Sequence, residues 1–330
     1  MDKVKVACHG TSGHQIVGLM PELERAELVA ISGVDEQGYQ ELKKRLPKAV
    51  GDTPHYPDLD TLLETCDFDM VSLCSDWRAA QADDAVRCLK AGKHVLAEKP
   101  MACSLEKLEE LRRAAEESGK ELRTMNSMVY VPKYWGVKDI IDSGEIGEVV
   151  QVYAMKSYPY NDNRPQELGK DGGLTMQAGI HAVSFVRFVT GLEFTEIFCQ
   201  DTKQGNPKEG ELRRASNMTS RMSNDALCCI LSNYCNPRAI GFHGNDQLRV
   251  FGTKGMVELV DGGNRRMWVT DEKAPSEFPD GKPTHKYVFD LIDCILDGTP
   301  TLLTQEDSLI NTEVVLKAQQ SAETGRVVKM

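Results

Sequence analysis

A glycine-rich turn near the start of the chain has the residues needed to cradle a phosphate group. Gly10 and Gly13 follow an apolar stretch, Val4–Cys8, and precede a stretch of helical character that continues to Leu23. Backbone N–H groups at the start of a helix bind a pyrophosphate, and glycine lets the backbone approach it closely. Cys8 stands where the first glycine of the usual Gly-x-Gly-x-x-Gly pattern would be, so two of the three glycines are present.

A carboxylate follows at the distance that such a turn requires. Asp35 ends a second apolar stretch, Leu28–Val34, and lies 22 residues beyond Gly13. A carboxylate in this position accepts hydrogen bonds from the ribose hydroxyls of NAD and repels the 2′-phosphate of NADP. Glu36 and Gln37, which come next, offer no arginine to that phosphate. We therefore expect NAD rather than NADP. The expected contacts from these two segments are Gly10, Thr11, Ser12, Gly13, His14 and Asp35.

Apolar strands and helices alternate through the first 125 residues, and these elements must position the turn. Continuous apolar strands are typical of a parallel sheet covered by helices on both faces. The sequence therefore predicts a Rossmann-type doubly wound α/β domain over residues 1–125. Strands are expected at Val4–Cys8, Leu28–Val34, Met70–Cys74, His94–Ala97 and Glu121–Met125, and helices at Tyr39–Arg45, Leu59–Glu64, Ala79–Ala91 and Leu105–Ser118.

The remaining residues, 126–330, have a different pattern. Short strands separated by turns follow one another from Thr195 to Thr270, which favours an α+β arrangement. We expect a second domain with a large, open, mostly antiparallel sheet that binds the substrate and supports oligomerisation. A long strand is expected at Glu148–Tyr158, and helices at Lys133–Ser143, Ala178–Thr190, His285–Leu296 and Gln305–Thr324.

The composition argues against several other classes of protein. The chain has 330 residues, of which 41% are hydrophobic and 27% charged, and its net charge of −11 disfavours nucleic acid and anionic membranes as partners. No apolar stretch approaches the roughly 18 residues of a membrane-spanning helix. The ten cysteines have neither metal-site spacing nor a secretory context. We expect reduced thiols, no bound metal and a cytoplasmic location.

One stretch of the first domain closely resembles the Gfo/Idh/MocA family of oxidoreductases. It covers residues 92–100 and ends in Glu98-Lys99-Pro100, the tripeptide that follows an apolar strand in that family. The similarity continues through residues 140–149, from Gly172-Gly173 to His181, through residues 252–255, and to residues 322–327. The resemblance therefore covers essentially the whole chain.

The resemblance implies an oxidoreductase with NAD in its first domain. It places Lys99 in the active site beside the nicotinamide. The family usually carries Asp-x-x-x-His on a helix of the second domain, and this chain has Gln177 and His181 at those positions. After the third strand the family usually has a proline and a histidine, where this chain has Trp77 and Gln81. The further cofactor contacts that the resemblance implies are Cys74, Ser75, Trp77, Gln81, Glu98, Lys99 and Asn126.

Lys99 and His181 have the chemistry that oxidation of a secondary alcohol needs. A neutral imidazole can take the hydroxyl proton as hydride leaves the carbon, and His181 is the candidate for this base. Lys99 can donate hydrogen bonds to the substrate oxygen and stabilise developing alkoxide charge. Gln177 is neither an acid nor a base, but it can hydrogen-bond a sugar hydroxyl as donor and acceptor. We expect Lys99 and His181 to form the catalytic pair in one cleft.

The loop that follows the long strand, residues 158–164, contains aromatic rings, amides and a cation. Tyr158 suits the face of a sugar, and Arg164 can bind a carboxylate or a phosphate. A solvated polar loop is the alternative interpretation. The residues expected to contact the substrate are Lys99, Asn126, Tyr158, Arg164, Gln177 and His181.

Three functions agree with these residues. The first is an NAD-dependent oxidoreductase that acts on a secondary alcohol of a sugar, glycoside or polyol. The second is a redox-neutral, NAD-dependent glycosidase that works by transient oxidation and elimination. The third is a non-enzymatic sensor of NAD or sugar, which the absence of the usual Asp and His at Gln177 and Gln81 leaves open. Because an open sheet face needs covering, we also expect a homodimer or homotetramer.

Overall fold

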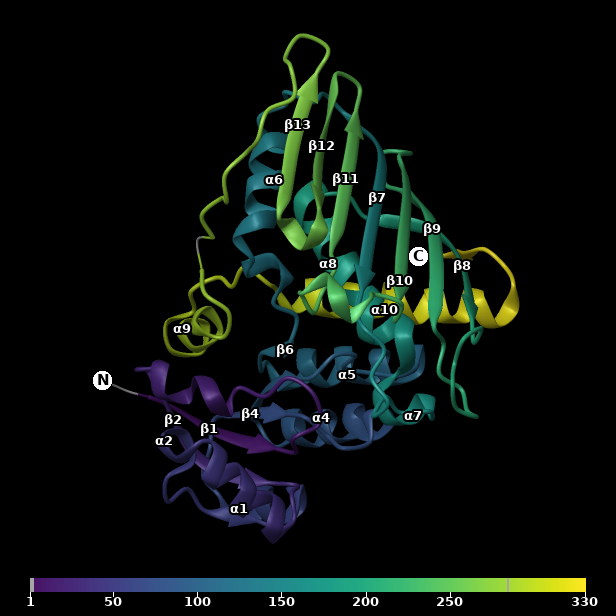
Figure 1. The fold of residues 1–330 in the computed structure, drawn as a ribbon. Coiled ribbons are helices and arrows are strands. Elements are labelled where there is room, and N and C mark those ends of the chain that lie inside the picture. The colour runs from purple at the N-terminus through teal and green to yellow at the C-terminus, as the bar shows by residue number, and fades with distance from the viewer. Residues whose placement is uncertain (1–2, 284) are drawn as a thin grey trace. The chain divides into compact units, whose positions relative to one another are not determined.

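A computed structural model describes residues 3–283 and 285–330 (Figure 1). The chain divides into two compact units. The first comprises Met1–Asn126 and His285–Leu309, and the second comprises Ser127–Thr284 and Ile310–Met330. None of the described helices is long and apolar enough to cross a membrane.

The first unit contains the predicted parallel sheet. Its described strands follow the order β3-β2-β1-β4-β5-β6, and every neighbouring pair is parallel. The order reverses between β1 and β4, and ligands of such sheets bind beyond the carboxyl ends of the strands at this point. The strands are β1 (Val4–His9), β2 (Ala26–Ser32), β3 (His55–Tyr56), β4 (Met70–Leu73), β5 (His94–Ala97) and β6 (Leu122–Thr124).

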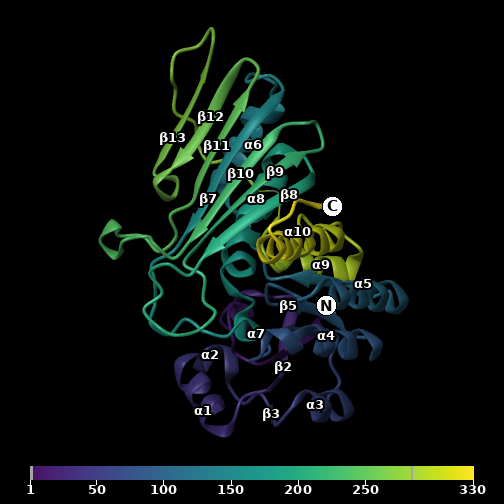
Figure 2. The same cartoon turned by 90° about the vertical axis from the view of Figure 1, so that its right-hand side faces the viewer.

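Helices cover both faces of this sheet, as predicted. On one face α4 and α5 pack together over β4 and β5, and α1 and α2 lie on the opposite side (Figure 2). Asp35, Asp58 and Ser104 each accept a hydrogen bond from a backbone N–H at a helix start, which fixes where α1, α3 and α5 begin. The helices are α1 (Glu36–Arg45), α2 (Pro47–Val50), α3 (Leu59–Thr65), α4 (Gln81–Lys90), preceded by the 3₁₀ turn η2 (Arg78–Ala80), and α5 (Leu105–Ser118).

The segment after the glycine turn differs from the expectation. The stretch expected to be helical up to Leu23 contains only a short 3₁₀ helix, η1 (Val17–Glu22), which starts four residues beyond Gly13. Pro21 lies inside it, and proline lacks the N–H that an α-helical hydrogen bond would need. The turn is therefore not followed directly by the N-terminus of an α-helix.

A segment from late in the chain completes the first unit. Helix α9 (Phe289–Asp297) belongs to the first unit, although the sequence had assigned residues 126–330 to the second domain. Leu291 and Ile292 are buried in the apolar core that includes strands β1 and β2. Arg25 forms ion pairs with Asp293 and Asp297 on the same helix. The apolar side of α9 thus covers apolar residues of β1 and β2 that the short η1 helix does not cover.

The second unit contains the large sheet, which is mixed but mostly antiparallel. Its order is β13-β12-β11-β7-β10-β9-β8-β14, and β7 and β10 are the parallel pair among the described strands. The strands are β7 (Val149–Ser157), β8 (Phe194–Thr202), β9 (Ala215–Met222), β10 (Leu227–Asn233), β11 (Gln247–Gly252), β12 (Gly255–Val260), β13 (Arg265–Thr270) and β14 (Val328–Lys329).

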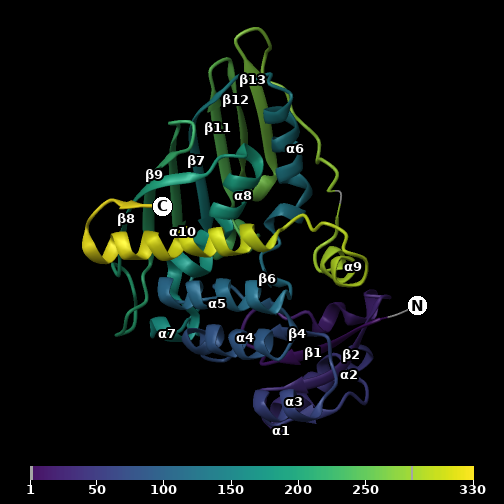
Figure 3. The ribbon, with the colours of Figure 1, turned by 180° about the vertical axis from the view of Figure 1, so that it is seen from behind.

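Helices lie on one face of this sheet, and no described helix of the unit covers the other (Figure 3). Helices α6 and α8 contact strands β12 and β7, and the part of α10 that belongs to this unit bonds to β8 through Ser321, whose hydroxyl accepts from the Cys199 N–H. Residues alternate along each strand, so buried Val152 and Ala154 face the helices while Gln151 and Tyr153 do not. The helices are α6 (Pro132–Asp142), α7 (Leu168–Asp171), α8 (Ile180–Thr190), which continues the π-helical turn η4 (Thr175–Gly179), and α10 (Gln305–Thr324); η3 (Met128–Tyr130), η5 (Arg238–Ile240) and η6 (Asp261–Gly263) are 3₁₀ turns.

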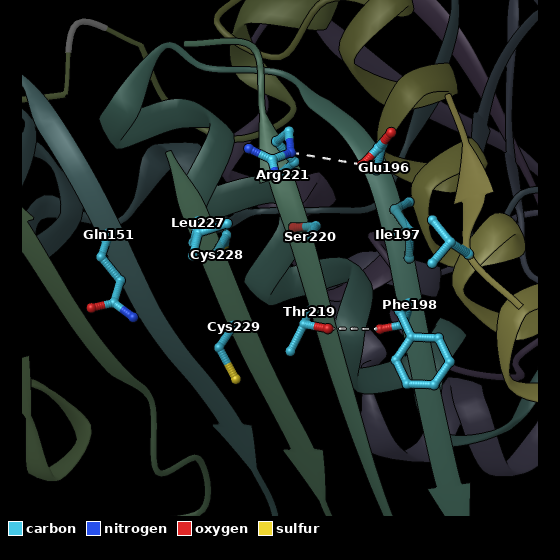
Figure 4. Close-up of a pocket in the computed structure, with 11 residues that line it drawn as sticks. Gln151, Glu196, Ile197, Phe198, Thr219, Ser220, Arg221, Leu227, Cys228 and Cys229 are labelled. Carbon is cyan, nitrogen blue, oxygen red and sulfur yellow. Dashed lines mark hydrogen bonds and ion pairs between the residues drawn. The ribbon is translucent and has the colours of Figure 1, made fainter. Parts of the chain in front are cut away.

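The open face carries a shallow depression over strands β7 to β10. Figure 4 shows Cys229, Thr219 and Phe198 side by side on neighbouring strands of this face, with Leu227 next to Cys229 along β10. Leu227 is 51% exposed although it is a large apolar side chain. An ion pair between Arg221 and Glu196 lies at one end of the depression.

Candidate active site

The glycine turn lies against the strand ends at the switch point of the first unit. Gly10 has a φ of +73°, and a Cβ atom there would lie 2.1 Å from the carbonyl oxygen of Cys74, which follows β4. Gly13 has a φ of +103°, and a Cβ atom there would lie 2.6 Å from the Glu98 carboxylate. Only glycine permits both the positive φ and this close approach. The N–H of Ser12 donates to the same Cys74 carbonyl, which fixes the turn at the place where a dinucleotide phosphate would bind.

Two polar side chains fasten the glycine turn to the Glu-Lys-Pro segment. Arg78 is buried, and its guanidinium donates to the carbonyl of Ser12 and to the side-chain oxygen of Gln81. Gln81 in turn donates to the carbonyls of Glu98 and Pro100, at 2.6 and 3.1 Å. The glutamine that stands at the usual histidine position therefore holds the backbone on both sides of Lys99.

Glu98 is a buried charged residue next to the glycine turn. Its side chain is 1% exposed, and its carboxylate lies 3.0 Å from Nδ1 of His14 and 3.9 Å from Nζ of Lys99. Burial alone would raise the pKa of Glu98, but the hydrogen bond to His14 and the charge of Lys99 hold that pKa below its ordinary value. Glu98 is thus kept as a carboxylate.

The other predicted cofactor contacts of the first unit occupy different environments. Asp35 is exposed at the end of β2, and its Oδ1 accepts a hydrogen bond of 2.7 Å from the Gly38 N–H. The Ser75 hydroxyl donates a hydrogen bond to the Asp84 carboxylate. Trp77, two residues after Ser75, is 44% exposed. Thr11 is exposed, whereas Asn126 is fully buried at the end of the unit.

These residues fit a dinucleotide. The turn that a Cβ atom would fill, the open carboxylate of Asp35 and the buried lysine all lie at or beyond the carboxyl ends of β1, β2, β4 and β5. NAD would be held by the backbone N–H groups of Thr11 and Gly13 and by the Asp35 carboxylate, because the N–H groups of Gly10 and Ser12 already donate to the carbonyls of Ser32 and Cys74. Among the described residues, no cluster of His, Cys, Asp and Glu side chains could hold a metal ion.

Gln177 and His181 lie on one continuous helical segment of the second unit. Gln177 is in the π-helical turn η4, and its amide donates to the backbone carbonyl of Asp171, at the end of α7. His181 lies in the first turn of α8 and is buried. A π-helical turn inside a helix often marks a functional position. The two candidates are one helical turn apart, as the family pattern requires.

Tyr158 and Arg164 lie next to a third aromatic ring that the sequence did not single out. The Arg164 guanidinium lies 3.9 Å from the ring centre of Tyr234 and 6.0 Å from that of Tyr158. Tyr234 is buried with Leu174 and Ala178, which flank Gln177 in sequence. This packing brings the predicted substrate loop to the helical segment that carries Gln177 and His181.

Several contributors escaped the sequence analysis. Arg78 could have been found from the sequence, because it is a charged residue between Trp77 and Gln81, which had both been predicted to contact the cofactor. Tyr287, whose pKa is raised by burial and by the charge of Glu98, comes from the segment before α9, and nothing in its sequence context points to the dinucleotide site. Tyr234 looked like an ordinary loop residue.

Comparison with known proteins defines the class to which this chain belongs. Residues 5–125 match the profile of the oxidoreductase family with an NAD-binding Rossmann fold, and residues 134–258 match that of the GFO/IDH/MocA C-terminal domain. The chain belongs to the Gfo/Idh/MocA family of NAD-dependent oxidoreductases, as its sequence predicted.

The individual relatives are distant. Myo-inositol 2-dehydrogenase of Thermotoga maritima is 25% identical over 93% of this chain and 92% of its own length. The oxidoreductase YrbE of Bacillus subtilis is 28% identical over 60% of this chain, and the match spans only 57% of that protein. The solved structure of an oxidoreductase from Thermotoga maritima superimposes with a TM-score of 0.90 at 25% identity, covering 99% of this chain and 100% of the other.

Proposed function

We propose that this chain transfers a hydride between NAD and a secondary alcohol of a sugar, glycoside or polyol. The observation that carries the proposal is a chain of hydrogen bonds through Arg78 and Gln81. It links the glycine turn to the backbone on both sides of Lys99. It supports a dehydrogenase because it fixes a buried lysine next to the place where a dinucleotide would bind. The match to an inositol dehydrogenase over most of the chain supports a polyhydroxylated substrate.

The proposed chemistry assigns a separate role to each predicted residue. NAD, when bound, supplies the acceptor for the hydride. Lys99 donates a hydrogen bond to the substrate oxygen and stabilises negative charge that develops on it. His181 takes the hydroxyl proton. Gln177 binds a neighbouring hydroxyl, because its amide can both donate and accept.

Turnover of variants tests these roles. NADH formation is followed with a panel of sugars, glycosides and inositols, and a substrate found in this way is used for the kinetics. His181→Ala should lower turnover by roughly two to four orders of magnitude, the effect of losing a general base. Lys99→Ala should lower it too, and the double variant should be less than additive if the two residues serve one proton path. Lys90→Ala, which removes an exposed lysine from α4, is the control.

Other outcomes would favour other functions or residues. Release of an aglycone without net NADH would indicate the glycosidase. Binding of NAD and sugar without turnover would indicate a sensor. Near-native turnover of His181→Ala would remove His181 from catalysis.

A further inference from the structure

Arg164 in the second unit is a cation without a carboxylate partner. Its guanidinium is stacked on the ring of Tyr234 and lies within 6.0 Å of the ring centre of Tyr158. It forms no ion pair with any carboxylate in the described part of the chain. In a chain with a net charge of −11, a partly buried arginine that contacts aromatic rings in place of an acid is available for an external anion.

Polar atoms around Arg164 are buried but unsatisfied. Its Nε and the hydroxyls of Tyr234 and Tyr160 lack a hydrogen-bond partner among the residues that the structure describes, and all three atoms are inaccessible. Leaving buried donors unpaired is unfavourable, so such groups are found mainly where a ligand or an ordered water completes them. Two of these three atoms belong to Arg164 and to Tyr234, the ring on which it stacks. The unsatisfied donors therefore lie next to each other.

A second group of charges gives this region an excess of positive charge. Asp246 is buried and lies 2.6 Å from Nζ of Lys156 and 3.2 Å from Nζ of Lys133. Tyr134 donates a further hydrogen bond to the same carboxylate. Two ammonium groups thus share one carboxylate, which leaves one unit of positive charge. Lys156 lies 5.1 Å from the ring centre of Tyr158, the ring that Arg164 also approaches.

The acid that opposes this charge most directly is Asp171. Its charge raises the pKa of Tyr234, while Arg164 lowers it. Burial is the larger influence on that hydroxyl and keeps it neutral, so Tyr234 can donate a hydrogen bond to an anion.

The place of this cluster in the unit connects it with the substrate. Tyr234 packs on Leu174 and Ala178, and Ala178 lies between Gln177 and His181 on the same helical segment. A group bound by Arg164 and Tyr234 would therefore lie next to the residues assigned above to the reacting alcohol.

We propose that Arg164, with the hydroxyl of Tyr234, binds a carboxylate or phosphate group of the substrate, so that the enzyme acts on an acidic sugar or polyol rather than a neutral one. This inference rests on the proposed function, because it names the substrate class of the same site. The anionic group would be a recognition group away from the carbon that is oxidised. It would orient the remaining hydroxyls toward Gln177 and His181.

Calorimetric titration with three probes tests the proposal. D-glucose, D-glucuronate and D-glucose 6-phosphate share a ring and differ in the group that Arg164 would bind, and each is titrated into the full chain saturated with NADH. We expect glucuronate or glucose 6-phosphate to bind at least tenfold more tightly than glucose, and the stronger of the two identifies the anion. Arg164→Gln should weaken binding of that anion by roughly 10- to 100-fold and leave glucose unaffected, with partial recovery in Arg164→Lys.

Arg265→Gln is the matched control, because Arg265 is an exposed arginine of β13 in the same unit and pairs with Asp261. It should bind all three probes like the native chain. Equal affinities for the three probes, or native affinity for the acids in Arg164→Gln, would overturn the inference. NADH formation is measured with the same probes. If the acids bind in a way that depends on Arg164 but no NADH forms, the proposed dehydrogenase activity is refuted and the anion site is supported. If glucose is turned over and Arg164→Gln does not change that turnover, the anion site is refuted and the dehydrogenase activity is supported.

Discussion

Asp35 combines a structural contact with the contact that would select the cofactor. Its Oδ1 caps helix α1 through the Gly38 N–H, and its side chain remains exposed at the end of β2. A carboxylate that is already held by a backbone hydrogen bond is oriented before the ribose arrives. Selectivity for NAD over NADP is therefore expected from this one residue, since a 2′-phosphate would meet its negative charge.

Replacement of Asp35 separates its two roles. In Asp35→Ser the helix cap is kept but the carboxylate is lost, and NAD affinity should fall by roughly 1–3 kcal/mol if two ribose hydrogen bonds disappear. NADP affinity should not fall. Fluorescence titration of both dinucleotides measures the effect. Asp58→Ser changes an equivalent cap on α3 and should leave both affinities unchanged. Equal native affinities for NAD and NADP would contradict the assignment.

His14 and Glu98 make the stability of the first unit dependent on pH. The pKa of Glu98 is lowered in the folded chain, so its contribution is present above the unfolded pKa of about 4.3 and is lost as pH falls through the folded pKa. In His14→Ala the strongest interaction that lowers this pKa is absent, while burial still raises it. The free energy of unfolding should then begin to fall at a higher pH than in the native chain.

Urea unfolding at a series of pH values from 7 to about 3 measures this shift. His55→Ala is the control, because it removes a histidine that pairs with an exposed carboxylate, Glu36, in place of a buried one. Its curve should keep the native shape. Superimposable acid limbs for His14→Ala and the native chain would show that the His14 contact does not support the Glu98 carboxylate.

At the scale of elements, the sequence was most informative where a pattern is local. Apolar stretches such as Met70–Leu73 are buried along their whole length, which marks parallel strands, and the turn residues and caps mark where helices begin. The same local pattern misled at η1. The apolar residues after Gly13 suggested an α-helix, but Pro21 restricts that segment to a 3₁₀ turn.

Non-local packing was beyond the sequence analysis. Helix α9 follows the strands of the second unit in sequence, and its place in the first unit depends on Leu291 and Ile292 meeting the core beside β1. Its helical pattern was recognisable, but the sheet on which it packs was not. The link from Arg78 through Gln81 to Glu98 has the same origin, because its hydrogen bonds join residues up to 66 positions apart.

At the scale of the whole molecule, one face of the large sheet is not covered by any described helix of its unit (Figure 3). Its strands present a mixture of apolar and charged side chains, with Leu227 and Val327 among the most exposed large apolar residues of the chain. The Arg221–Glu196 ion pair borders the depression and offers polar contacts at its margin. An apolar centre with a charged margin is the usual composition of a protein interface. We propose that a second copy of this chain covers the face.

A single charge on this face should separate the copies. Leu227, the first residue of β10, pairs with Gln151 of β7 and lines the depression on the open face, and Leu227→Glu would bury a carboxylate in the proposed interface. Light scattering coupled to size-exclusion chromatography at micromolar concentration should show a dimer or tetramer for the native chain and a 36.7 kDa species for the variant. The control is Val150→Glu, since Val150 is 50% exposed but has the opposite alternation along β7. Its mass should remain that of the native oligomer, because an added charge outside the face leaves the contact intact. A native chain that elutes at 36.7 kDa, or two variants that behave alike, would show that the open face is not where copies of this chain meet.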